Sequence, residues 1–94
     1  MLRIGVMVSG GGTNLQAIID SISEGKLPNC KIVTVVSSKE GVFALERAKK
    51  HSIPYAVISK KAFKTQEEYD ISLLEHMRAY EVDLVVRDAM VGLY

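Results

Sequence analysis

The sequence predicts an α/β protein with an open parallel sheet, Rossmann-like in its β-α-β-α-β-α-β order. Two observations support this fold class. Short apolar runs alternate with amphipathic helical segments along the chain, and the run at residues 4–8 has no polar side chain. Such a run is typical of a strand buried on both faces of a parallel sheet. Crossover helices join parallel strands with right-handed connections, so we expect a single open sheet.

The first half of the chain contains two of the expected strands. The strand Ile4–Val8 leads through glycines into a helix that begins at Thr13 and ends near Gly25. An apolar stripe at helical spacing identifies this helix, formed by Leu15, Ile18, Ile19 and Ile22. The second strand is Ile32–Val36, and every residue in it is β-branched, which favours a strand over a helix.

The second half repeats the pattern. A short helix around residues 42–48 ends in a basic turn, which suits the negative end of a helix dipole. A third strand covers Pro54–Ile58, and Thr65 with Glu68 has the spacing of a capping box for the next helix. The fourth strand is Leu84–Val86.

Length and composition suit one small domain, which we place at residues 1–94. The net charge of +1 gives no electrostatic argument for a nucleic-acid partner or for an acidic membrane surface. The start of the chain does not resemble a signal peptide, and no run approaches the length of a membrane span. A single cysteine, Cys30, fits a reducing compartment, so we expect a cytoplasmic protein.

A run of three glycines is the strongest functional signal. Gly10, Gly11 and Gly12 lie between the first strand and the first helix. Glycine loses more conformational entropy on folding than any other residue, so ordering three of them there is costly. A helix N-terminus presents free N–H groups to an anion, and glycines allow a close approach. Thr13 and Asn14 add side-chain donors. We therefore predict that these five residues bind a phosphate group.

Two commoner phosphate motifs do not fit this loop. The ATP-binding loop needs a Gly-Lys-Ser/Thr triplet, which the sequence lacks. The dinucleotide motif needs a third glycine where Leu15 stands and an acidic residue near Ser38, so a dinucleotide enzyme is disfavoured. A phosphate monoester on a smaller ligand fits better, and a tight turn without any ligand is the remaining alternative.

Other chemically active residues give weaker signals. His51 and His76 have no partner at a metal-ligand spacing, so we expect structural or solvated histidines and no metal site. Cys30 is expected to be a small core residue. The basic loop of Lys60, Lys61 and Lys64 either attracts phosphate or is simply solvated. Asp88 lies just after the fourth strand, where catalytic carboxylates often occur, but on its own it is weak evidence for a catalytic site.

The segment Val8–Ile18, reading VSGGGTNLQAI, resembles the opening of phosphoribosylglycinamide formyltransferase (glycinamide ribonucleotide transformylase). The similarity continues to Val86 through Ser37-Ser38-Lys39, Leu45–Ala48 and Tyr69-Asp70. It implies the N-terminal half of a formyltransferase fold. It also implies a phosphoribosyl ligand, glycinamide ribonucleotide, whose phosphate Gly12, Thr13 and Asn14 hold.

The resemblance implies 10-formyltetrahydrofolate as the co-substrate of the full-length family, in purine synthesis. Gln66 stands where the family has an arginine that contacts the folate, so it is the candidate folate-side contact. The family's catalytic Asn, His and Asp lie in a later part, so we expect a truncated chain with no catalytic residues, weak folate binding and no activity alone. The alternative is a non-catalytic phosphate-binding or self-assembling α/β module, forming homo-oligomers through the open edge of the strand Leu84–Val86.

Overall fold

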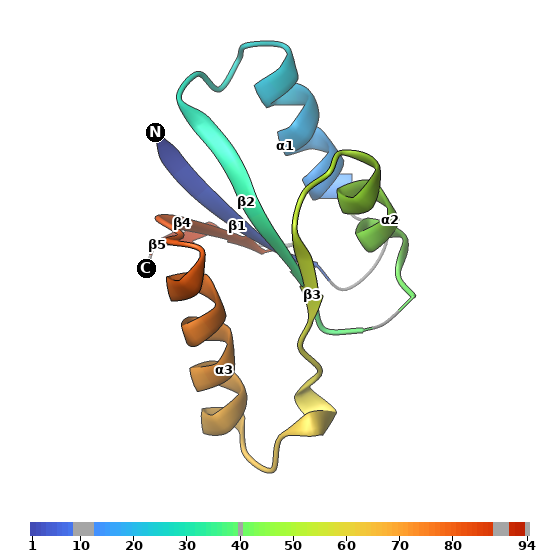
Figure 1. Cartoon of the computed structure of the whole chain (residues 1–94), viewed down its shortest axis with the longest axis vertical. Coiled ribbons are helices and arrows are strands. Elements are labelled where there is room, and N and C mark those ends of the chain that lie inside the picture. The colour runs from blue at the N-terminus through green and yellow to red at the C-terminus, as the bar shows by residue number, and fades with distance from the viewer. Residues whose placement is uncertain (9–12, 40, 88–90, 94) are drawn as a thin grey trace.

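The computed structural model describes residues 1–8, 13–39, 41–87 and 91–93. Their strands form a five-stranded sheet in the order β3-β2-β1-β4-β5 (Figure 1). The strands are β1 (Leu2–Val8), β2 (Cys30–Ser37), β3 (Tyr55–Val57), β4 (Leu84–Arg87) and β5 (Val91–Leu93). The helices are α1 (Thr13–Ser23), α2 (Phe43–Lys50) and α3 (Gln66–Ala79), with a 3₁₀ helix, η1 (Lys60–Ala62).

The first four strands are parallel, which confirms the predicted open α/β sheet. The fifth strand was not predicted. β5 runs antiparallel to β4, with Val86 opposite Val91 and Leu84 opposite Leu93. The prediction of β4 as an open edge is therefore wrong, because β5 occupies its outer side. Three residues carry too little periodicity to be recognised as a strand, and only their pairing with β4 identifies them.

Local signals fix the helix ends where the sequence predicted them. Gly25, with φ of 77°, follows α1, and the N–H groups of Gly25 and Lys26 donate to the carbonyls of Ile22 and Ser21. This is the Schellman arrangement, which favours glycine because the left-handed backbone lacks a Cβ clash. At the start of α3, the Thr65 hydroxyl accepts a hydrogen bond of 3.1 Å from the Glu68 N–H.

Helices cover the two faces of the sheet unequally. α1 and α2 pack on one face, which we call the two-helix face, around buried residues that include Val6, Leu15 and Val35. α3 packs alone on the opposite, one-helix face, against Val36 and Val85 (Figure 1). Alternate residues of one strand supply both cores, since Val85 packs on the one-helix face and its neighbours Leu84 and Val86 pack on the other.

Arg3 joins the end of α3 to the sheet. Its guanidinium donates to the carbonyls of Tyr80, at 2.7 and 3.1 Å, and Glu81, at 3.1 Å. Its backbone N–H donates to the Asp83 carboxylate at 3.0 Å. A cation that satisfies carbonyls at a helix C-terminus also interacts favourably with the helix dipole. Arg3 therefore stabilises both the end of α3 and the entry of the chain into β4.

Candidate functional site

The carboxyl ends of β1, β2 and β3 meet at one edge of the sheet. Backbone hydrogen bonds continue past the strands there, from Ser38 N–H to the Val8 carbonyl at 3.2 Å and from Ile58 N–H to the Ser37 carbonyl at 2.9 Å. In open α/β sheets ligands bind beyond this edge. The candidate site is therefore built from the segments that leave these three strands.

The predicted phosphate loop lies at the end of β1. Gly10, Gly11 and Gly12 fall outside the described residues, so their assignment stays a prediction. Thr13 and Asn14 form the first two residues of α1, as the sequence predicted. The N-terminus of this helix, where the first N–H groups have no partner within the helix, thus follows β1 after residues 9–12.

The structure brings Arg47 to the first turn of α1, which the sequence did not predict. Its guanidinium donates to Gln16 Oε1 at 3.0 Å and lies 4.7 Å from the centre of the Phe43 ring. Gln16 in turn donates to Asp20 at 2.9 Å. In the sequence Arg47 belongs to the basic end of a helix and to the motif Leu45–Ala48, and no local signal links it to a residue 31 positions earlier.

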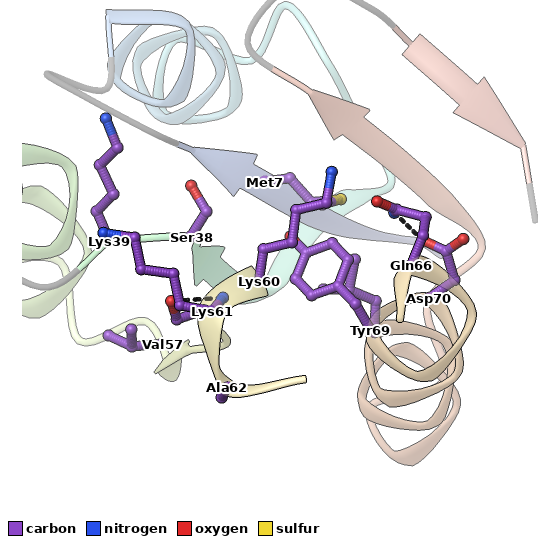
Figure 2. Close-up of a pocket in the computed structure, with 12 residues that line it drawn as sticks. Met7, Ser38, Lys39, Val57, Lys60, Lys61, Ala62, Gln66, Tyr69 and Asp70 are labelled. Atoms are coloured by element: carbon purple, nitrogen blue, oxygen red, sulfur yellow. Dashed lines mark hydrogen bonds between the residues drawn. The ribbon is translucent and has the colours of Figure 1, made fainter. Parts of the chain in front are cut away.

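A cleft of about 1030 Å³ opens beside α3 at the same edge of the sheet (Figure 2). Its lining comes from the ends of β1, β2 and β3, from η1 and from the first half of α3. The residues are Met7, Ser38, Lys39, Val57, Ser59, Lys60, Lys61, Ala62, Gln66, Tyr69, Asp70 and Leu73. The cleft therefore collects two of the basic-loop lysines, the candidate folate-side residue and the Ser38-Lys39 motif.

Gln66 lines this cleft and is hydrogen-bonded to a neighbour on its own helix. Its side-chain amide donates to the Asp70 carboxylate at 2.9 Å, one helical turn further along α3. Because Gln66 is the first residue of α3 and the hydroxyl of Thr65 caps that helix, its backbone is well defined. A neutral amide lacks the charge and the bidentate fork of an arginine, so it holds a carboxylate less strongly.

Of the remaining candidates, His76 and Cys30 contact the interior of the fold. His76 Nε2 lies 2.8 Å from the hydroxyl of buried Thr34, and burial lowers the pKa of this imidazole from its ordinary value of 6.5. Cys30 is half-buried and packs against the core of the two-helix face. His51 is exposed at the end of α2. Asp88 falls outside the described residues.

In residues 1–8, 13–39, 41–87 and 91–93, no three His, Cys, Asp or Glu side chains are grouped so that they could hold a metal ion. No helix in that part of the chain is long and apolar enough to cross a membrane.

Comparison with known proteins assigns this arrangement to a family. The family model described as formyl transferase matches residues 2–91. The chain is 42% identical over 86 residues to a phosphoribosylglycinamide formyltransferase of Haemophilus influenzae, and the match covers 92% of this chain and 40% of that protein. It is also 43% identical over 84 residues to the trifunctional purine biosynthetic protein adenosine-3 of Chironomus tentans, with 88% of this chain and 6% of that protein covered.

Solved structures agree with the sequence comparisons. Glycinamide ribonucleotide transformylase 1 from Symbiobacterium toebii superposes with a TM-score of 0.88 at 39% identity, over 93% of this chain and 41% of that one. The phosphoribosylglycinamide formyltransferase of Coxiella burnetii, solved with CHES, gives a TM-score of 0.86 at 33% identity, over 98% of this chain and 41% of that one. The chain thus spans about two fifths of the length of these three formyltransferases and transformylases.

Proposed function

The chain belongs to the formyl transferase family, and from this premise we propose that it is the substrate-binding, N-terminal part of a glycinamide ribonucleotide formyltransferase of purine synthesis. One observation carries the proposal. The match runs through almost the whole chain, from residue 2 to residue 91, and includes the connection from β1 into α1. In this role the backbone amides of Gly10–Gly12 and the N-terminus of α1 hold the phosphate of the ribonucleotide.

The proposed role is binding rather than catalysis. Formyl transfer needs a general acid or base and donors that stabilise a tetrahedral oxyanion. In the described part of the chain, His76 bonds to Thr34 within the fold and His51 lies beyond the end of α2, away from the cleft lining. We therefore expect no formyl transfer by this chain alone.

The folate co-substrate of the family is 10-formyltetrahydrofolate, which brings the formyl group to the reaction. Gln66 is the residue of this chain that we place beside it. Its amide keeps one N–H that is not bonded to Asp70 in the described structure, so it can donate a hydrogen bond but cannot neutralise a carboxylate. We accordingly propose weak folate binding by this chain.

The substitution Asn14→Asp tests the phosphate site. A carboxylate at the start of α1 interacts favourably with the helix dipole but repels a phosphate. The fold should therefore persist while binding of glycinamide ribonucleotide weakens. We expect about fivefold weaker binding or more, because like charges about 4 Å apart in water repel by about 1 kcal/mol. Titration calorimetry measures the change.

The matched control is Asn29→Asp, the same chemical change at the opposite, amino end of the sheet. Asn29 precedes β2 and has φ of 63°, a conformation that aspartate also tolerates. Equal loss of binding in both variants, or no loss in Asn14→Asp, would contradict the phosphate site. Turnover of glycinamide ribonucleotide and 10-formyltetrahydrofolate by the 94-residue chain would contradict the purely binding role.

Self-assembly is the alternative that the sequence left open. With β5 beside β4, an assembly through that side of the sheet would have to pair with β5 rather than with β4. Sedimentation of the purified chain over a range of concentrations tests it, and a strictly monomeric chain would remove it.

A further inference from the structure

The cleft beside α3 carries an excess of positive charge. Among the lining residues that the structure describes, Lys39, Lys60 and Lys61 are cationic and Asp70 is the one carboxylate. Within the described residues no carboxylate forms a salt bridge with any of the three ammonium groups, whereas Lys26 pairs with Glu24 at 2.9 Å. Asp70 already accepts the amide of Gln66. We call this region the lysine cleft.

Serine hydroxyls fix the backbone beneath two of these lysines. Buried Ser37 accepts a hydrogen bond of 3.0 Å from the Lys39 N–H and donates one to the Lys39 carbonyl, so the turn after β2 is closed. Ser59 accepts from the Lys61 N–H at 3.3 Å and so caps η1. The lysine side chains remain free to rotate, but they start from defined positions on two different segments.

An apolar wall, formed by the end of β1 and by α3, lines the cleft opposite the lysines. Met7, Tyr69 and Leu73 line the cleft, and Tyr69 packs edge-on against Phe63 with the ring centres 6.0 Å apart. Figure 2 shows that the lysines come from the side of the cleft formed by β2 and η1, whereas Gln66, Tyr69 and Asp70 come from α3. Charges beside an apolar wall are screened less than charges in open water, so they attract an anion more strongly.

We propose that the lysine cleft is a binding site for an oligoanion, a ligand with two or more linked carboxylate or phosphate groups. Three cations on two segments suit several linked anionic groups better than one, because each added group gains a further charge-assisted contact without a second association step. The volume of about 1030 Å³ also exceeds the needs of a single phosphate. The site uses none of the residues of the predicted phosphate loop, so its test does not depend on binding of glycinamide ribonucleotide, although Gln66, the proposed folate-side contact, lies in the same cleft.

The substitution pair Lys60→Gln with Lys61→Gln tests the site. We expect this double variant to bind tripolyphosphate or triglutamate about tenfold more weakly than the parent chain at low salt. Lys49→Gln with Lys50→Gln is the matched control, because it removes two adjacent, exposed lysines at the end of α2, outside the cleft. The control should lose less than about twofold, the small effect of exposed charges outside the contact.

Titration calorimetry with the two probes also identifies the anionic group. Tighter binding of tripolyphosphate assigns the site to linked phosphates, and tighter binding of triglutamate assigns it to linked carboxylates. Either result supports the proposal if the Lys60/Lys61 double variant binds that probe about tenfold more weakly. Equal losses in the two double variants would show attraction by overall charge and overturn the proposal. So would the failure of both probes to bind the parent chain.

Amide shifts in NMR spectra separate this site from the phosphate loop. Binding in the lysine cleft should move the resonances of residues 59–66, at η1 and the start of α3. Shifts confined to residues 13–16 would place the probe at the N-terminus of α1, which would overturn the oligoanion site and leave the proposed function intact. Shifts at residues 59–66 in a chain that does not bind glycinamide ribonucleotide would support the oligoanion site and contradict the proposed function.

Discussion

The hydrophobic cores on the two faces of the sheet differ in size. Ten buried residues form the core cluster of the two-helix face in the described structure, including Leu15, Val35 and Ala48, each fully enclosed. Five form the cluster of the one-helix face, including Leu73 and Met77. Two helices cover one side of the sheet, where a smaller pocket of about 240 Å³ remains, whereas α3 alone leaves the cleft of about 1030 Å³ on the other.

This difference separates stability from binding. The cleft opens on the one-helix face, and its lining includes Tyr69 and Leu73, which belong to the smaller core. Sparse cover provides the space that a ligand needs, but it removes apolar burial that would stabilise the fold. Three experiments test whether the two faces differ in energy as they differ in packing.

The largest effect should come from the same truncation made on each face. Leu15→Ala on the two-helix face and Leu73→Ala on the one-helix face both remove a leucine that is at least 97% buried. We expect Leu15→Ala to lower the free energy of unfolding by about 4 kcal/mol and Leu73→Ala by about 2–3 kcal/mol. The smaller loss reflects easier relaxation around the cleft.

Urea unfolding followed by circular dichroism measures both losses. Should Leu15→Ala not fold, the pair Leu15→Val and Leu73→Val makes the same comparison at smaller amplitude. Equal losses on the two faces would show that the one-helix face is as tightly packed as the other.

A smaller effect should come from Gly5, a strand residue that lies against Met77 of α3. A Cβ at Gly5 would lie 2.7 Å from the sulfur of Met77 and 3.1 Å from a methyl group of Val82. Gly5→Ala should therefore destabilise the chain by about 1–3 kcal/mol, since overpacking forces neighbouring groups to move. The measurement is again denaturant unfolding.

A double-mutant cycle shows whether the contact with Met77 is the cause. Met77→Ala removes the crowded sulfur, so Gly5→Ala should cost less in that background than in the parent chain. Strict additivity of the two losses would mean that the one-helix face is loose enough to absorb the methyl group without help from Met77.

The smallest effect should be the pH dependence from His76. Burial lowers the pKa of this imidazole in the folded chain, so below its ordinary value of 6.5 the unfolded chain takes up the proton more readily. Neutral, buried His76 therefore contributes fully to the free energy of unfolding above about pH 6.5. This contribution is lost as the pH falls through the lowered pKa of the folded chain. The free energy of unfolding should thus decline less between pH 7 and pH 5 in His76→Gln, which keeps a polar group near Thr34.

His51→Gln is the matched control for this measurement, because that histidine is exposed. Its stability profile should follow that of the parent chain. A His76→Gln profile parallel to the parent profile would show that His76 is no more buried in solution than His51.

Much of the architecture was predictable because its causes are local. The apolar strands, the stripe of α1, the cap at Thr65 and the stop at Gly25 each depend on residues within a few positions of one another. Tyr69, Leu73 and Met77 follow one another at four-residue spacing in the sequence, and all three are buried on one side of α3. The candidate site was predictable only in part, as a glycine loop at the carboxyl end of a strand and as Gln66 from the family resemblance.

The sequence by itself determined the order of the first four strands and the three α-helices, the capped helix ends and the family, since hydrophobic periodicity, capping residues and the glycine motif are all local features of the chain. Only the tertiary structure decided that β5 pairs with β4, that Arg47 bonds to Gln16, and that Lys39 shares one cleft with Lys60, Lys61 and Gln66. The physical reason is that these contacts join segments far apart in sequence. Their partners are set by how the helices pack on the sheet and by no local pattern.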